Sequence, residues 1–240
     1  MIFRQLFDQT SSTYTYLLAD DASREAALID PVLEQLPAYL QLLQELNLRL
    51  VLALDTHVHA DHITALGRLR EATGCRSMMG QEAQSDCASA RFAHGQSLAI
   101  GQLRLQALYT PGHTDDSYSF YLASGGMVFT GDTLLIRGTG RTDFQNGDAA
   151  QQYQSLFGQL LTLPPETVVY PAHDYKGWTS STIAEERAHN PRLQVASQAD
   201  YVALMRNLKL PTPRLMDVAV PANRACGMPA ADASAPKPTP

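Results

Sequence analysis

The sequence predicts an α/β protein built as one sizeable domain, and three observations carry this prediction. The chain has 240 residues, a length that suits a single domain of this class. Hydrophobic residues make up 45% of it and charged residues 18%, which is the composition of a globular protein with a core. Runs with the two-residue period of strands alternate along the chain with runs that have the helical period.

The N-terminal part is expected to begin with strands and to continue as a strand–helix–strand unit. Short alternating runs separated by turn-forming residues predict strands at 2–7, 14–18 and 26–29. Apolar residues then recur at helical spacing over 36–46, before a β-rich run at 48–54. A second helix is expected to begin between Asp61 and Thr64 and to end near Gly74, because glycine readily takes the left-handed conformation of a helix end.

The same alternation continues to the end of the predicted domain. Alternating or short apolar runs predict further strands at 103–107, 118–122, 127–130 and 168–170. Helical spacing predicts helices at 149–161, 183–189 and 199–208. The segment 228–240 is rich in Ala and Pro and has nothing to bury, so we expect a folded domain over 1–227 followed by a disordered tail.

Charge and hydropathy argue against two classes of partner. The chain has 18 basic and 24 acidic residues, a net charge of −6, whereas proteins that bind nucleic acid usually carry a basic surplus. No stretch approaches the roughly 18 uninterrupted apolar residues that a membrane-spanning helix needs. We therefore expect neither nucleic acid nor a membrane as a partner.

The N-terminus and the cysteines favour a cytoplasmic protein. Residues 1–8 lack a basic region followed by an apolar region, and they already alternate like a strand, so they resemble the start of a fold more than a signal peptide. The three cysteines, Cys75, Cys87 and Cys226, are an odd number without CxxC spacing. This pattern favours reduced, structural thiols over a disulfide framework or a thiolate metal site.

Five of the seven histidines lie in three short clusters, each directly after a predicted strand. An aspartate follows a fourth strand in the same way. The residues with metal-ligand chemistry at these strand ends are His57, His59, Asp61, His62, His113, Asp132 and His173. Strand ends would deliver these side chains to one edge of the sheets, so the pattern predicts a metal site.

In this order, the motifs around these residues resemble the metallo-β-lactamase superfamily. They are THVHADH at 56–62, TPGHT at 110–114, TGD at 130–132 and PAHD at 171–174. The resemblance covers most of the chain and implies an αββα sandwich with its metal site at one edge of the two sheets. Because this superfamily includes hydrolases and oxygenases, the fold alone does not decide the function.

Within the superfamily the sequence is similar to the glutathione persulfide dioxygenases of the ETHE type. The similarity is carried by residues 56–62, 131–145, 170–177, 190–193 and 220–223. It implies an enzyme that converts glutathione persulfide, O₂ and water to glutathione and sulfite. Relatives of this type are often dimers, so a homodimer is possible.

The resemblance also implies the metal and its ligands. One Fe(II) per chain would be held by His57, His113 and Asp132. Two imidazoles and one carboxylate form the ligand set of non-haem Fe(II) oxygenases, which leaves positions open for the persulfide sulfur and O₂. Other residues would lie near the metal without binding it and act in catalysis by orienting ligands or moving protons. These are His59, Asp61, His62 and His173.

Glutathione persulfide carries two carboxylates, so its pocket needs cations even in an acidic protein. Arg141 is the first candidate for substrate binding, followed by Tyr175 and Lys176. Arginine suits this task because its planar guanidinium pairs with a carboxylate through two hydrogen bonds. In the alternative interpretation, Arg141 braces its own loop through a salt bridge to Asp143 or Asp174.

The residues alone leave two other functions open. One is a glyoxalase II-like hydrolase of glutathione thioesters, with two metal ions and a bridging hydroxide. Its first ion would use His57, His59, His113 and Asp132, and its second would use Asp61, His62, Asp132 and His173. All of these residues are present, so the preference for a single iron depends on the surrounding runs. The other alternative is a catalytically silent metal-binding or sulfur-carrier module.

Overall fold

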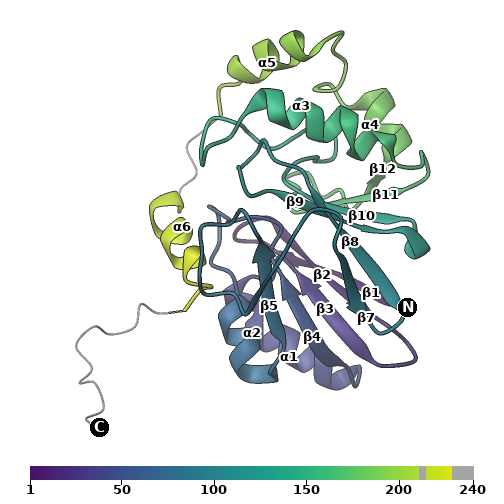
Figure 1. Cartoon of the computed structure of the whole chain (residues 1–240), viewed down its shortest axis with the longest axis vertical. Coiled ribbons are helices and arrows are strands. Elements are labelled where there is room, and N and C mark those ends of the chain that lie inside the picture. Colours follow the sequence, from purple (N-terminus) through teal and green to yellow (C-terminus); the bar gives the residue numbers. More distant parts are fainter. Residues whose placement is uncertain (211–214, 229–240) are drawn as a thin grey trace.

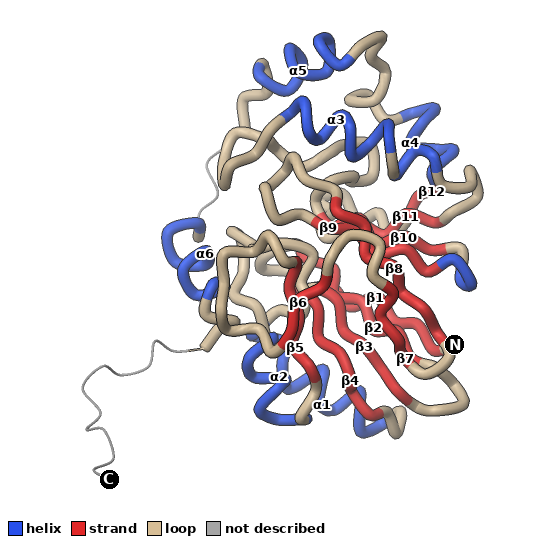
Figure 2. The backbone as a smooth tube through the Cα atoms, in the orientation of Figure 1, coloured by secondary structure: helices blue, strands red, loops and turns tan. Residues whose placement is uncertain are grey.

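The computed structural model describes residues 1–210 and 215–228, and its strands form two six-stranded sheets (Figure 1). The sheets pack face to face, and helices cover the outer face of each, as the tube view also shows (Figure 2). This layering confirms the αββα sandwich. Within the described ranges, no helix is both long and apolar enough to cross a membrane.

The first sheet has the strand order β1-β2-β3-β4-β5-β6, and two helices cover its outer face. Its elements are β1 (Ile2–Asp8), β2 (Thr13–Ala19), β3 (Glu25–Ile29), α1 (Leu36–Glu45), β4 (Arg49–Leu54), α2 (Leu66–Thr73), β5 (Arg76–Gly80) and β6 (Ala90–Phe92). The first three strands pair antiparallel and the last four pair parallel. Every residue of β2 is buried, because the strand is covered on both faces.

The second sheet has the order β12-β11-β10-β9-β8-β7, with three helices over its outer face. Its elements are β7 (Ser97–Ile100), β8 (Leu103–Tyr109), β9 (Tyr118–Leu122), β10 (Met127–Gly131), α3 (Ala149–Gly158), β11 (Val168–Pro171), β12 (Ser181–Thr182), α4 (Ile183–His189) and α5 (Gln198–Arg206). Only β10 and β11 pair parallel.

Three apolar clusters hold the layers together. The cluster between the sheets contains packed aromatic rings, among them Tyr16 and Phe129, whose centroids lie 4.9 Å apart. A second cluster packs α1 and α2 against the first sheet, and a third packs α3, α4 and α5 against the second sheet. Burial of apolar area in these layers is the main favourable contribution to folding. It also holds the two sheets together, so that the strand ends that carry the site lie at one common edge.

Some elements differ from the sequence expectations. The second helix begins at Leu66, because the residues before it form a loop held by long-range hydrogen bonds. The predicted helix over 149–161 ends at Gly158, and a 3₁₀ turn follows at Leu160–Thr162. Four strands and one α-helix of the described ranges were not anticipated: β5, β6, β7, β12 and the C-terminal helix α6 (Met216–Arg224). The predicted tail lies outside the described residues except for Met228.

The expectation that all three cysteines are reduced thiols is wrong for two of them. Cys87 and Cys226 form a disulfide with an S–S distance of 2.01 Å, while Cys75 is free and buried. The paired residues are 139 positions apart in the chain, and the fold brings the loop between β5 and β6 next to the end of α6. Spacing along the sequence carries no information about such a tertiary neighbourhood.

Candidate metal centre

The strand ends meet as the sequence predicts. The loops that carry His57, His113 and Asp132 follow β4, β8 and β10, so the three residues come from both sheets. One potential ligand atom of each lies within 4.8 Å of the others. The imidazole rings of His57 and His113 are nearly perpendicular, with centroids 5.0 Å apart. Two ring nitrogens and one carboxylate oxygen therefore face a common point.

Hydrogen bonds select the ring nitrogen that each histidine presents. His113 Nδ1 lies 2.7 Å from the carbonyl oxygen of Arg141 and must donate to it, which leaves Nε2 as the free electron pair. Thr56 Oγ1 donates its proton to Asp30 and therefore accepts from His57 Nδ1 at 3.0 Å. Both histidines thus offer Nε2, and this donor set fits a divalent transition metal.

Close packing fixes the ligand loops. A Cβ atom at Gly140 would lie only 2.8 Å from His113 Cγ and would also overlap the carbonyl oxygen of Asp132, so only glycine fits here. Asp116 connects two loops, because its carboxylate accepts from the backbone N–H of Val58 at 2.9 Å and from Thr114 Oγ1 at 2.6 Å. The loops are therefore placed by contacts that do not involve a metal.

Asp132 and His173 are coupled by a short hydrogen bond. His173 Nδ1 donates to Asp132 Oδ1 at 2.7 Å, and Nε2 donates to Asp61 Oδ2 at 2.9 Å. Burial opposes the charge on the His173 ring, but the two carboxylates outweigh it and raise the pKa of this histidine well above its ordinary value. Burial likewise opposes ionisation of Asp132, yet His173 holds the pKa of that carboxyl far below its usual range.

A second group of potential ligands lies beside the first. His59, Asp61 and His62 also place ligand atoms within 4.8 Å of one another. His59 Nε2 lies 3.1 Å from Asp30 Oδ1, and His62 Nδ1 lies 2.9 Å from Asp61 Oδ2. Within the described ranges, His59 Nδ1 and His62 Nε2 are buried without a hydrogen-bond partner. Each of these two nitrogens keeps an electron pair that can bind a metal ion.

Two buried carboxyls at the strand ends were missed by the sequence reasoning. Asp30 follows β3 and Asp55 follows β4, so the strand-end rule used for the histidines could have found both. Asp30 accepts from the backbone N–H of Thr56 at 2.7 Å as well as from its hydroxyl. Burial raises the pKa of Asp55 to about 8. Asp55 Oδ1 accepts from Thr64 Oγ1 at 3.0 Å.

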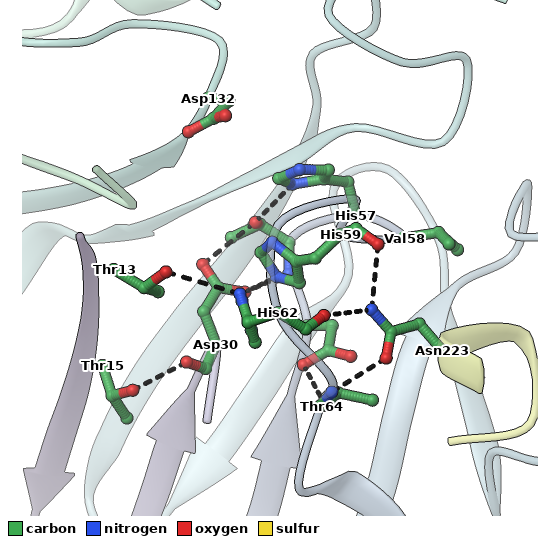
Figure 3. Close-up of polar contacts among 12 residues, drawn as sticks. Thr13, Thr15, Asp30, His57, Val58, His59, His62, Thr64, Asp132 and Asn223 are labelled. Atoms are coloured by element: carbon green, nitrogen blue, oxygen red, sulfur yellow. Dashed lines mark hydrogen bonds and ion pairs between the residues drawn. The ribbon is translucent and has the colours of Figure 1, made fainter. Parts of the chain in front are cut away.

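Asn223 is a third buried polar residue of this region. Figure 3 shows it reaching from α6 to the segment between Leu54 and Leu66, which carries His57, His59 and His62 and is called the histidine loop below. Its Oδ1 accepts from the backbone N–H of Thr64 at 2.8 Å. Its Nδ2 donates to the carbonyl oxygens of His59 and His62 at 2.9 and 2.8 Å. Residues 220–223 are one of the runs that resemble the dioxygenase family, but the run does not reveal these contacts, which span more than 150 residues.

The three expected substrate-binding residues have different surroundings. The guanidinium of Arg141 pairs with Asp143 through bonds of 2.6 and 2.8 Å and lies 4.4 Å from the ring centre of Phe144. This is the bracing contact of the alternative interpretation, made with Asp143. Tyr175 is 73% exposed, and its ring is parallel to that of His173 with centroids 6.0 Å apart. Lys176 is exposed on the same loop.

Comparison with known proteins adds to this geometry. A family model described as the metallo-beta-lactamase superfamily matches residues 9–87 and 90–173. The human mitochondrial persulfide dioxygenase ETHE1 is 48% identical over 231 residues, covering 95% of this chain and 89% of that protein. The crystal structure of ETHE1 from Myxococcus xanthus superposes with a TM-score of 0.92 at 58% identity, covering 95% of this chain and 100% of that chain. A probable hydroxyacylglutathione hydrolase from Schizosaccharomyces pombe is 36% identical, covering 69% of this chain and 65% of that protein.

Proposed function

Because this chain belongs to the metallo-beta-lactamase superfamily and, within it, to the ETHE1 persulfide dioxygenase family, we propose that it oxidises glutathione persulfide. The reaction uses O₂ and water and yields sulfite and glutathione. The observation that carries the proposal is the combination of 48% identity over 95% of the chain with the convergence of two imidazoles and a carboxylate.

We propose that His57, His113 and Asp132 hold one Fe(II) per chain. The two free Nε2 atoms and the carboxylate match the ligand set of non-haem iron oxygenases. When bound there, the iron would bring the persulfide sulfur and O₂ together and activate oxygen.

The residues around these ligands would keep them in the right protonation state and orientation. His173 donates to Asp132, so the carboxylate stays ionised and keeps one oxygen directed toward the site. Asp61 accepts from the other nitrogen of His173 and balances its positive charge. His59 and His62 would orient the loop or move protons, since each has one ring nitrogen bound to a carboxylate.

The substrate would be held by its glutathionyl carboxylates. Arg141 and Lys176 supply the positive charge, and the exposed ring of Tyr175 beside His173 supplies a surface at the rim of the site. The carbonyl of Arg141 accepts from His113, so the residue that would bind substrate is also joined to a ligand loop. Binding energy from the remote carboxylates would then position the terminal sulfur.

One observation favours a second candidate function. The glyoxalase II-like hydrolase of glutathione thioesters would place His59 on its first ion and His62 on its second, and each of these histidines has an unpartnered ring nitrogen that suits this role. A matched pair of assays separates the candidates. Protein purified without oxygen is analysed for metal, and oxygen uptake is then followed after glutathione persulfide is added.

About one iron per chain with rapid uptake supports the dioxygenase. Two metal ions per chain, thioester hydrolysis and no oxygen uptake would contradict it. Metal binding with neither reaction would identify the silent module.

For compartment and assembly, we propose a cytoplasmic enzyme that can form a homodimer. The free buried thiol of Cys75 suits a reducing compartment, whereas the Cys87–Cys226 disulfide is of the kind found in oxidising ones. Cell fractionation and analytical ultracentrifugation test the two expectations.

A further inference from the structure

The side chain of Asn223 joins the C-terminal helix α6 to the histidine loop. Asn223 is fully buried, and its amide uses both Nδ2 protons and Oδ1 on backbone groups of the loop. The carbonyl of His59, the carbonyl of His62 and the N–H of Thr64 are all bound at 2.8 to 2.9 Å. Figure 3 shows these contacts converging from one side of the loop.

These contacts matter because the loop has no helix or strand of its own between Leu54 and Leu66. Its backbone groups therefore lack the hydrogen bonds of a regular ladder, and a buried polar group without a partner destabilises the fold. Removing the amide would leave two carbonyls and one N–H without their bonds. The proposed ligand His57 lies in the same segment, two residues before His59.

The disulfide fastens α6 at its C-terminal end. Cys226 follows Asn223 by three residues and is joined to Cys87 in the loop between β5 and β6. Ser85 Oγ donates to the carbonyl of Arg224 at 2.8 Å, and the N–H of Gly67 donates to the carbonyl of Cys226 at 3.0 Å. The end of the helix is thereby tied to the β5–β6 loop and to α2.

We propose that Asn223 is a positioning residue for the histidine loop, and that the Cys87–Cys226 disulfide holds Asn223 in contact with this loop. The metal site would then respond to the redox state of this pair. The inference rests on the proposed function for the identity of the metal. Asn223, Cys87 and Cys226 are not among the residues proposed to touch the metal or the substrate.

The redox step uses a small thiol such as glutathione, which the proposed reaction releases. Its thiolate attacks Sγ of the half-buried Cys87, forms a mixed disulfide and releases Cys226 as a thiolate, which takes up a proton. A second thiolate attacks the mixed disulfide, releases the Cys87 thiolate and leaves as oxidised glutathione. Two thiols are oxidised and one protein disulfide is reduced.

The positioning role is tested by hydrogen exchange on the full-length chain with and without iron. Asn223→Ala removes the amide, and Asn223→Asp keeps the volume but replaces the donor. Val220→Ala is the control on the same helix, because it weakens apolar packing without removing these bonds. We expect exchange over residues 57–66 to rise roughly tenfold in both Asn223 variants but not in the control.

Iron release to a chelator and steady-state kinetics give independent readouts. Both Asn223 variants should release iron about tenfold faster and lose kcat by about tenfold, with KM for glutathione persulfide unchanged. Unchanged exchange over 57–66 in both variants, or an equal rise in Val220→Ala, would overturn the positioning role. Altered exchange in an enzyme whose parent shows no oxygen uptake would instead overturn the proposed function and leave the positioning role intact.

The disulfide is tested by Cys87→Ser and by reduction of the parent with a phosphine, which is not a thiol. Cys75→Ala is the matched control, since it removes a buried cysteine that forms no disulfide. Both treatments should speed iron release about tenfold, and the control should not. In the Asn223→Ala variant, loss of the disulfide should raise the rate of iron release little further, because Asn223 and the disulfide act on the same loop. Equal release rates for the parent, the reduced parent and Cys87→Ser would refute the redox dependence.

Discussion

Asp132 divides its two carboxylate oxygens between His173 and the ligand group. Oδ1 lies 2.7 Å from His173 Nδ1, whereas Oδ2 lies 3.5 Å from His113 Nε2. One oxygen is thus fixed by a charged donor while the other faces the proposed iron position. A hydrogen bond of this kind orients a metal ligand before the metal arrives.

The first prediction concerns the proposed ligands. Replacing His57, His113 or Asp132 by Ala should remove iron and lower activity to about 1% or less, because each supplies one of three protein donors. The far-UV circular dichroism should stay close to that of the parent, since the loops are also placed by contacts such as Asp116 to Val58. Metal analysis and oxygen uptake check this. If a variant keeps its iron, the residue that was replaced is not a ligand.

The second prediction concerns His59, whose Nε2 is bound to Asp30 and which lies outside the group formed by the three proposed ligands. His59→Ala should keep most of the iron but lose activity roughly 10- to 100-fold, through misaligned neighbours. Metal content and activity are measured on the same sample. Iron loss as complete as in His57→Ala would place His59 on the metal and favour the dinuclear hydrolase.

The third prediction separates the two roles of Arg141. If it binds a glutathione carboxylate, Arg141→Gln should retain iron and raise KM, with a loss of about 1.5 to 3 kcal/mol in transition-state stabilisation. A small persulfide without these carboxylates should be a poor substrate that the substitution barely affects.

Asp143→Asn is the control for this residue, because it removes the salt-bridge partner and keeps the positive charge. Substrate binding by Arg141 predicts that KM does not rise in this variant. A purely bracing role predicts that both variants lose thermal stability and iron, while the active fraction of Arg141→Gln keeps the parental KM.

The fourth prediction concerns pH and Asp116, which joins the loops of His57 and His113 through Val58 and Thr114. Burial raises the pKa of its carboxyl above the unfolded value of about 3.9. A raised folded pKa contributes stability that is fully present below the unfolded pKa and is lost as pH rises through the folded pKa.

Asp116→Asn removes this titration while keeping one carbonyl acceptor. Relative to the parent, the variant should therefore gain stability as pH rises from about 4 and reach a plateau above the folded pKa. Urea unfolding of both proteins across this range measures the difference. A difference that does not change with pH would show that the carboxyl titrates as in the unfolded chain.

Much of the fold follows from local patterns. The strand at Tyr118–Leu122 and the helix at Ile183–His189 match the predicted bounds, because period and turn residues agree there. The strands β5 and β6 are short and are held by pairing with parallel neighbours, so their own sequences carry only a weak strand pattern. Helix α6 contains Pro221, which argues against a helix when only the sequence is read.

The candidate site could also be predicted in part from the sequence. The strand-end rule finds the residues that converge, since their positions depend on topology. The rule cannot find Asn223 or the pairing of Cys87 with Cys226, because both depend on which distant segments become neighbours. The roles of the converging residues in catalysis stay predictions that the experiments above address.

The proposed ligands are divided between the sheets, with His57 after a strand of the first and the other two after strands of the second. Chains are synthesised from the N-terminus at about 5 to 20 residues per second. Until synthesis reaches residue 113, a nascent chain displays the histidines of residues 57–62 without His113 or Asp132. The full three-residue site can form only after Asp132 has left the ribosome. Metal binding by the complete site therefore follows a period in which the partial histidine cluster has already been exposed to cellular cations.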